Sequence, residues 1–213
     1  METPFTEPFG SFENLLGKPG AQPVDILFGG NPAAIHKLAG ENIQSRLRGV
    51  ILMWISNALS SPRTLVLSTG NKSEMAVGYC TLYGDMAGGL ALISDVPKMM
   101  VYRIAKFLNG KMHNAIPQSI IDREPTAELA ANQKDTDSLP PYPVLDEIVR
   151  LFVEDRKSAQ EIVEAHVADE ATVRRVIRMI EGAEYKREQA APGLKVTSKA
   201  FGVGRRIPIA RGV

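Results

Sequence analysis

The chain has 213 residues, of which 44% are hydrophobic and 23% charged, and this composition indicates one globular domain with at most a small appendage. Its 25 basic and 24 acidic residues nearly cancel, so the net charge points to no particular partner, while the single cysteine, Cys80, excludes an internal disulfide framework and indicates a reducing cytoplasm. No run approaches the roughly 20 apolar residues of a membrane span, and the acidic start of the chain, Met1–Gly10, is not that of a signal peptide.

The first forty residues are rich in proline and glycine and give weak structural signals. Residues Val24–Phe28 predict a short strand, and the run Gly29–Pro32 after it predicts a loop. A lone pair of glycines is weak evidence for a phosphate-binding turn. We therefore treat residues 1–40 as a segment apart from residues 41–213.

Residues Asn42–Leu59 carry apolar side chains at helical spacing and predict an amphipathic helix. Arg46 and Arg48 cannot share its apolar face, and surface arginines in contact with solvent are the simplest interpretation. The apolar face is broader than a chain of this length is expected to bury, so we expect self-association through this helix. The face consists of Ile43, Leu47, Val50, Ile51, Trp54, Ile55 and Leu59.

A buried strand is predicted at Thr64–Leu67, followed by a polar turn at Ser68–Ser73 and a helix that runs from near Glu74 to near Tyr83. Such a joint presents backbone N–H groups to a phosphate or a carboxylate, and Lys72 adds positive charge at the turn. One interpretation of the joint is therefore a ligand site.

The other interpretation needs no ligand. Connections from strand through turn to helix are common, and either Ser73 or Asn71 can serve as the N-cap of the helix. From the residues alone this capped helix is the favoured interpretation. Cys80 falls inside the predicted helix, where we expect a small buried core residue and not a nucleophile.

Residues Leu90–Ile93 predict a second buried strand, and a helix is predicted after it. We expect Asp95 as its N-cap with Pro97 in its first turn, and Gly110 as its end. Lys98 then occupies the first turn, where the helix dipole disfavours a cation. A cation in that position predicts that an anion binds beside it.

The remaining chain divides into a long loop and a helical portion. Residues His113–Tyr142 contain many prolines and several acids and predict the loop. Residues 143–188 are predicted to be helical, with a capping box at Ser158–Glu161 and another N-cap at Asp169. Residues 189–213 form a basic tail.

Nucleophilic hydrolysis and zinc chemistry are not indicated by the sequence. The three histidines, His36, His113 and His166, are scattered along the chain. Neither a zinc-like cluster of histidine and cysteine nor a Gly-x-Ser-x-Gly motif occurs. We therefore look for a function that depends on binding and positioning.

Five separated stretches carry a more specific signal: Glu41–Gly49, Thr69–Tyr79, Leu82–Asp85, Glu124–Leu129 and Gln133–Tyr142. In this order they resemble the synthetase domain of NAD+ synthetases, most closely the glutamine-dependent bacterial kind. The resemblance extends from about Glu41 to the C-terminus and does not cover the first forty residues. It implies an α/β fold, namely part of an adenine-nucleotide α-hydrolase-like (ATP pyrophosphatase) domain with a helical C-terminal portion.

The resemblance implies that ATP and Mg2+ are used to adenylate the nicotinate carboxylate of deamido-NAD, after which ammonia from glutamine or free ammonia displaces AMP and leaves NAD+. The protein would act mainly by positioning and charge neutralisation. By their positions in the motifs, three residues are implied for ATP binding: Thr69, Lys98 and Thr126. Five are implied for deamido-NAD binding: Arg46, Glu74, Asp85, Tyr185 and Lys186. Glu74 is also implied as a ligand of the metal.

The chain departs from the family pattern at several places. Leu82 stands where simpler members carry a lysine, and Gly89 stands where they carry an aspartate. The Ser-Gly-Gly-x-Asp-Ser pyrophosphate loop is not found in these residues. We therefore expect a truncated or split synthetase with little activity alone, acting as a homodimer or with a partner chain that carries the loop, and with a glutaminase as a further partner.

Two other functions stay open. One is a non-catalytic dimerisation or regulatory paralogue. The other is a nucleic-acid binder, because Ser158–Ile180 superficially resembles a helix-turn-helix and the tail after it is basic. A nucleic-acid-binding module is usually basic overall, whereas this chain is balanced, so neither a nucleic-acid partner nor a membrane is expected.

Overall fold

The computed structural model describes residues 37–59, 64–130, 132–202 and 204–212. The chain divides into two units, residues 1–44 and 45–213, and helix α3, Lys37–Ala58, crosses the boundary between them. The strand predicted at Val24–Phe28 and the loop after it lie outside the described residues. The division of the chain at residue 40 stays a prediction. Among the described helices, none has both the length and the apolar character needed to cross a bilayer.

Two short strands in the second unit form a parallel pair. Strand β1, Leu67–Ser68, pairs with β2, Leu90–Ala91, with Leu67 opposite Leu90. Parallel neighbours need a crossover connection, and helix α4, Lys72–Val77, lies in that connection. Both strands are shorter than predicted, but the order of strand, helix and strand is the predicted one.

Helix α4 is also shorter than predicted. It ends at Val77, because Gly78 adopts the left-handed conformation (φ 68°) that closes a helix C-terminus. A Cβ atom at this position would lie 2.8 Å from the Cβ of Ala183, so space and backbone conformation both favour glycine. The prediction that the helix continues to about Tyr83 is wrong, and Cys80 lies in a bend after the helix.

Helix α5, Lys98–Lys111, begins differently from the prediction. Pro97 occupies the N-cap position, so the assignment of Asp95 as the N-cap is wrong. The backbone N–H groups of the first two residues donate instead to Ser73 Oγ at 2.9 Å and to Asp146 Oδ2 at 2.8 Å. Side chains from two other elements therefore supply the cap.

The chain is mostly helical between Tyr142 and Arg187, and the local signals predicted there are confirmed. Ser158 and Glu161 form the predicted capping box, and Asp169 is the predicted N-cap. Between these helices and α5 lie a helix and a 3-10 turn that the sequence treated as loop. The elements are α6 Gln118–Asp122, η2 Asp135–Asp137, α7 Tyr142–Val149, the π-helical turn η3 Arg150–Glu154, α8 Ala159–Glu164, α9 Glu170–Gly182, α10 Glu184–Arg187 and η4 Ile209–Gly212.

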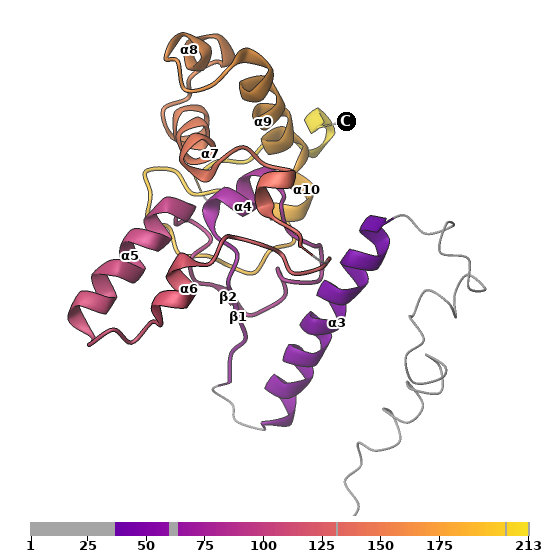
Figure 1. Ribbon diagram of the computed structural model, residues 1–213. Helices are drawn as coiled ribbons and strands as arrows, with labels where there is room; N and C mark the ends of the chain where they lie inside the picture. Colours follow the sequence, from indigo (N-terminus) through magenta and orange to yellow (C-terminus); the bar gives the residue numbers. More distant parts are fainter. Residues whose placement is uncertain (1–36, 60–63, 131, 203, 213) are drawn as a thin grey trace, which may run out of the picture. The chain divides into compact units, whose positions relative to one another are not determined.

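Helix α4 is central to the second unit, and helices α5, α7 and α9 pack around it (Figure 1). Ala76 and Val77 on α4 belong to one buried core with Leu145 on α7 and Val176 on α9. This core fixes the turn before α4 and the loop after it. Most of the site residues implied by the resemblance lie on these two segments or contact them.

Candidate substrate-binding site around helix α4

The first turn of α4 is closed by its own side chains. Asn71 Oδ1 accepts from Glu74 N at 3.0 Å, and Glu74 Oε2 accepts from Asn71 N at 3.0 Å, which is a capping box. Lys72 N donates to Val96 O at 2.9 Å. These N–H groups are therefore not presented to a ligand, and the interpretation as a helix capped by Asn71 is the one observed.

Lys72 is fully buried and does not face a ligand, so the prediction that it adds charge at the turn is wrong. Its Nζ lies 3.0 Å from Asp95 Oδ1 and 3.0 Å from Glu154 Oε1. It also donates to Thr197 Oγ1 at 2.5 Å and to Lys199 O at 2.8 Å. A buried ammonium needs such partners, because an unpaired charge away from water is very costly.

The two acids of this cluster are held in their charged form. Burial alone raises the pKa of Asp95, but the backbone N–H groups of Thr197 and Val196, the Thr197 hydroxyl and Lys72 lower it below the ordinary value. The pKa of Glu154 is lowered in the same way, because Ser198 and Lys72 outweigh the effect of burial. This cluster was not predicted, because its members are far apart along the chain.

Glu74 and Lys98, both implied as site residues, bind each other. Lys98 Nζ lies 3.0 Å from Glu74 Oε1 and 5.1 Å from the centre of the Tyr142 ring. Both side chains are mostly buried, with 18% of each exposed. The dipole of α5 disfavours the Lys98 cation, and the carboxylate of Glu74 offsets this effect. Glu74 thus occupies the place beside Lys98 where the sequence predicted an anionic ligand.

The residues that the structure describes do not form an all-protein metal cluster. Among them, no three acidic, histidine or cysteine side chains gather closely enough to hold a metal ion. Both carboxylate oxygens of Glu74 already accept hydrogen bonds, from Asn71 and Lys98. The metal role of Glu74 stays a prediction.

The loop after α4, residues 78–85, contains Asp85 and is contacted by Arg46 and Lys186, all three implied for deamido-NAD. Arg46 Nε on helix α3 donates to Leu82 O at 3.1 Å. Asp85 Oδ1 accepts from Thr81 N at 2.7 Å and from Ser45 Oγ at 3.1 Å. Asp85 therefore shapes the loop and fixes it to α3, although its side chain is exposed enough to meet a ligand.

Lys186 on α10 binds the same loop. Its Nζ donates to Gly78 O and to Cys80 O, both at 2.7 Å. An ammonium group has three N–H donors, so one stays available after these two bonds. The neighbouring Tyr185 is exposed, with 43% of its surface accessible.

The two threonines implied for ATP are not joined to these groups by hydrogen bonds between described residues. Thr69 is exposed immediately after β1. Thr126 Oγ1 accepts from Glu128 N at 3.1 Å within its own turn. Glu128 O in turn accepts from Arg48 Nη2 at 3.2 Å, which connects the turn to helix α3. Arg48 is exposed, as predicted, and this bond is made at the surface.

Cys80 is not an activated nucleophile. Burial raises the pKa of its thiol to about 12, while Lys186 acts in the opposite direction with a smaller effect. Reactive cysteines have lowered pKa values, because the thiolate is the nucleophile. The raised pKa favours an unreactive thiol, but Cys80 is half-buried and lies outside the helix, so the prediction of a buried core residue within the helix is wrong.

Comparison with known proteins identifies the family. Residues 22–190, well over half of the chain, match the family described as NAD synthase. The chain belongs to the NAD synthase family. The match begins at residue 22 and so extends upstream of Glu41, where the motifs alone placed the start of the resemblance.

Curated NAD synthase relatives of this chain are named glutamine-dependent NAD(+) synthetases. The protein of Synechocystis sp. is 54% identical over 174 residues, which are 82% of this chain and 30% of the relative. The protein of Xanthomonas campestris is 48% identical over 213 residues, which are 100% of this chain and 36% of the relative. The chain thus spans about a third of the length of these relatives.

Solved structures of NAD synthases show the same fold. The glutamine-dependent enzyme of Cytophaga hutchinsonii matches 95% of this chain and 32% of its own length with a TM-score of 0.71 and 22% identity. The NH3-dependent enzyme of Campylobacter jejuni matches 78% of this chain and 58% of its own with a TM-score of 0.52 and 21% identity. The predicted partial adenine-nucleotide α-hydrolase-like fold is confirmed.

Proposed function

We propose that this chain forms part of an enzyme that converts deamido-NAD to NAD+ by ATP-dependent amidation. The carboxylate of deamido-NAD attacks the α-phosphorus of ATP and releases pyrophosphate, and ammonia then attacks the acyl-adenylate and releases AMP. The observation that carries this proposal is the identity of 48% over all 213 residues to a glutamine-dependent NAD(+) synthetase. Glutamine, through a glutaminase partner, or free ammonia would supply the nitrogen.

The loop at residues 78–85 gives the proposal a physical basis for binding deamido-NAD. Arg46 is anchored to it through Nε alone, and its two terminal nitrogens make no hydrogen bond with another described residue. Lys186 is anchored through two of its three donors. Both cations are thus held in place and still have donors for phosphate or carboxylate oxygens. Asp85, Tyr185 and Glu74 complete the proposed deamido-NAD set.

ATP is proposed to bind near the start of α5. Lys98 has two N–H donors beyond its bond to Glu74, and the Thr69 hydroxyl is exposed. Thr126 would add a hydroxyl from the loop before η2. Magnesium would be held by Glu74 together with phosphate oxygens of ATP, and it would neutralise phosphate charge there.

The remaining phosphate-binding groups are proposed to come from outside these 213 residues. The printed sequence contains no Ser-Gly-Gly-x-Asp-Ser, the loop that grips the phosphates in this family. A partner chain or another segment of the same protein would supply it. The single cysteine and the balanced charge favour a cytoplasmic setting for this assembly.

The first test separates binding from turnover. The 213-residue chain should bind deamido-NAD weakly in calorimetry and should form no NAD+ from deamido-NAD, ATP, magnesium and ammonium. Addition of a polypeptide that carries Ser-Gly-Gly-x-Asp-Ser should restore NAD+ formation. Turnover near 1 s⁻¹ by the chain alone, the low end of ordinary enzymes, would contradict the need for that loop.

Arg46→Ala tests the proposed substrate contact. It should weaken deamido-NAD binding about tenfold or more, the usual effect of losing one charge-assisted hydrogen bond, and raise KM in the restored reaction more than it lowers kcat. Arg103→Ala is the control, because Arg103 is an exposed arginine on α5 with no bond to another described residue. Equal effects of the two substitutions would remove Arg46 from the proposed site.

A further inference from the structure

A basic pocket lies between the π-helical turn η3 and the C-terminal loop, and the proposed function does not use it. Its volume is about 300 Å³. Four of its six lining residues are cations, and no acid lines it. The lining residues are Phe152, Arg156, Lys157, Lys199, Gly204 and Arg205.

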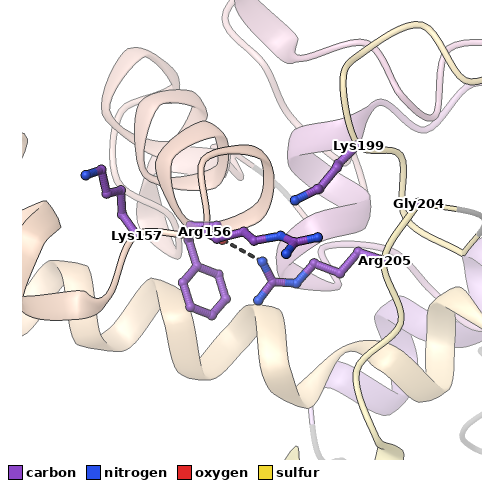
Figure 2. Close-up of a pocket in the computed structure, with 6 residues that line it drawn as sticks. Arg156, Lys157, Lys199, Gly204 and Arg205 are labelled. Atoms are coloured by element: carbon purple, nitrogen blue, oxygen red, sulfur yellow. Dashed lines mark hydrogen bonds between the residues drawn. The ribbon is translucent and has the colours of Figure 1, made fainter.

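Three of the four cations converge. Figure 2 shows the nitrogen ends of Arg156, Lys199 and Arg205 pointing toward one another, whereas Lys157 extends away from them. Lys157 is already paired with Glu161 at 3.0 Å. Arg156 and the Lys199 ammonium form no hydrogen bond or ion pair within the part of the chain that the structure describes, so their charges are not neutralised by the protein there.

The surrounding structure holds these cations in place. Arg205 Nη1 donates to Phe152 O at 2.6 Å, and its guanidinium lies 4.6 Å from the centre of the Phe152 ring. Lys199 is fixed through its backbone oxygen, which accepts from the buried Lys72. Arg156 has a left-handed backbone (φ 60°), a conformation that residues with a side chain rarely adopt.

The convergence has an electrostatic cost that an anion would relieve. The pKa of Lys199 is lowered by desolvation and then by the charges of Arg156 and Arg205, while Asp155 acts in the opposite direction. Asp155 is itself paired with Arg150 at 2.6 Å. The acid that acts on Lys199 is therefore already paired with another cation.

We propose that this pocket binds a small polyphosphate anion of about the size of pyrophosphate. The two guanidinium groups can each donate two parallel hydrogen bonds to phosphate oxygens, and the ammonium adds a compact positive charge. The pocket is concave, so it suits a small anion better than an extended strand of nucleic acid. The balanced charge of the whole chain also argues against nucleic acid. The pocket shares no residue with the proposed deamido-NAD and ATP sites, although pyrophosphate is also a product of the proposed reaction.

Calorimetry with pyrophosphate as the probe, in physiological salt, tests the proposal. The 213-residue chain should bind one pyrophosphate through this pocket. Lys199→Gln and Arg156→Gly should each weaken binding by about tenfold or more. Glycine is chosen at position 156 because it suits the left-handed backbone, so the variant keeps the fold.

Lys157→Gln is the matched control, because it removes a cation of the same pocket that points away from the other three. It should change the affinity by less than about twofold, which is typical of an exposed ion pair. Loss of binding in Lys98→Gln but not in Lys199→Gln would place pyrophosphate at the proposed ATP site and overturn the proposal. Duplex DNA that binds more tightly than pyrophosphate, with the same dependence on Arg156, would overturn it in favour of nucleic acid.

Discussion

Lys72 shows how one residue of the motif can serve the fold and not the ligand. The Lys72→Met substitution keeps much of the side-chain volume but leaves Asp95 and Glu154 without their shared cation. Breaking a buried ion pair in this way destabilises a protein by about 3–5 kcal/mol. Urea denaturation should show this loss, and a loss below about 1 kcal/mol would mean that water reaches the cluster.

The same cluster predicts a dependence of stability on pH. The pKa values of Asp95 and Glu154 are lowered in the folded protein, so their contribution is present above their ordinary pKa values of 3.8 and 4.5 and is lost as the pH falls through the lowered values. The free energy of unfolding should therefore fall at acid pH. Asp146 works against this trend, because burial raises its pKa. The decisive measurement is the difference between wild type and Lys72→Met, which should shrink as the pH is lowered.

Residues with local partners could be predicted from the sequence, and residues with distant partners could not. The cap of Asp169 on Thr172 lies three residues along the chain, and the capping box of Ser158 with Glu161 has the same spacing. Lys72 instead binds a residue 125 positions away, Thr197, and no periodicity encodes such a pair. The motifs implied Arg46 and Lys186 as residues that bind deamido-NAD. That both contact the same loop, residues 78–85, is seen only in the structure.

Substitution of two glycines by alanine is expected to have opposite effects on stability. Gly78→Ala should destabilise the protein by about 1–2 kcal/mol from the left-handed backbone alone, and contact with Ala183 should add to this. Gly110→Ala should stabilise it by about 0.5–1 kcal/mol, because Gly110 lies within α5 and nothing stands within 4 Å of its added Cβ. Thermal unfolding of both variants checks these opposite signs. A stabilising Gly78→Ala would contradict the assigned helix end.

At the level of elements, the type of structure was predicted better than its limits. The apolar residues that recur at helical spacing in α7 and α9 are buried in the core. Their spacing correctly predicted helical structure from Val144 onward. The start of α5 was missed, because its cap comes from Ser73 and Asp146 and not from the neighbouring Asp95. Tertiary caps of this kind leave no signature next to the helix.

The whole molecule carries an apolar surface on α3 that predicts self-association. Ile51 and Ile55 are 47% and 40% exposed, and their spacing places them on one helix face with Val50 and Trp54 close by. Exposed apolar patches of this kind usually mark an interface. Sedimentation at micromolar concentration should show a dimer, and the Ile51→Asp, Ile55→Asp double variant should shift it to monomer.

Phe107→Asp provides the control for that experiment. Phe107 is 63% exposed on α5, so the substitution adds the same charge on another helix. It should leave the sedimentation of the chain unchanged. A clean monomer in the wild-type protein would refute self-association through α3.

The burial of Lys72 also sets an order of events during synthesis. Its ammonium emerges early, whereas Thr197 and the carbonyl of Lys199 are 125 and 127 residues further along the chain. Until those groups are made, the ammonium has to stay hydrated, and the start of α4 cannot close over it. The helix that lies at the centre of the second unit is thus expected to be among the last to dock, only after residues 197–199 have left the ribosome.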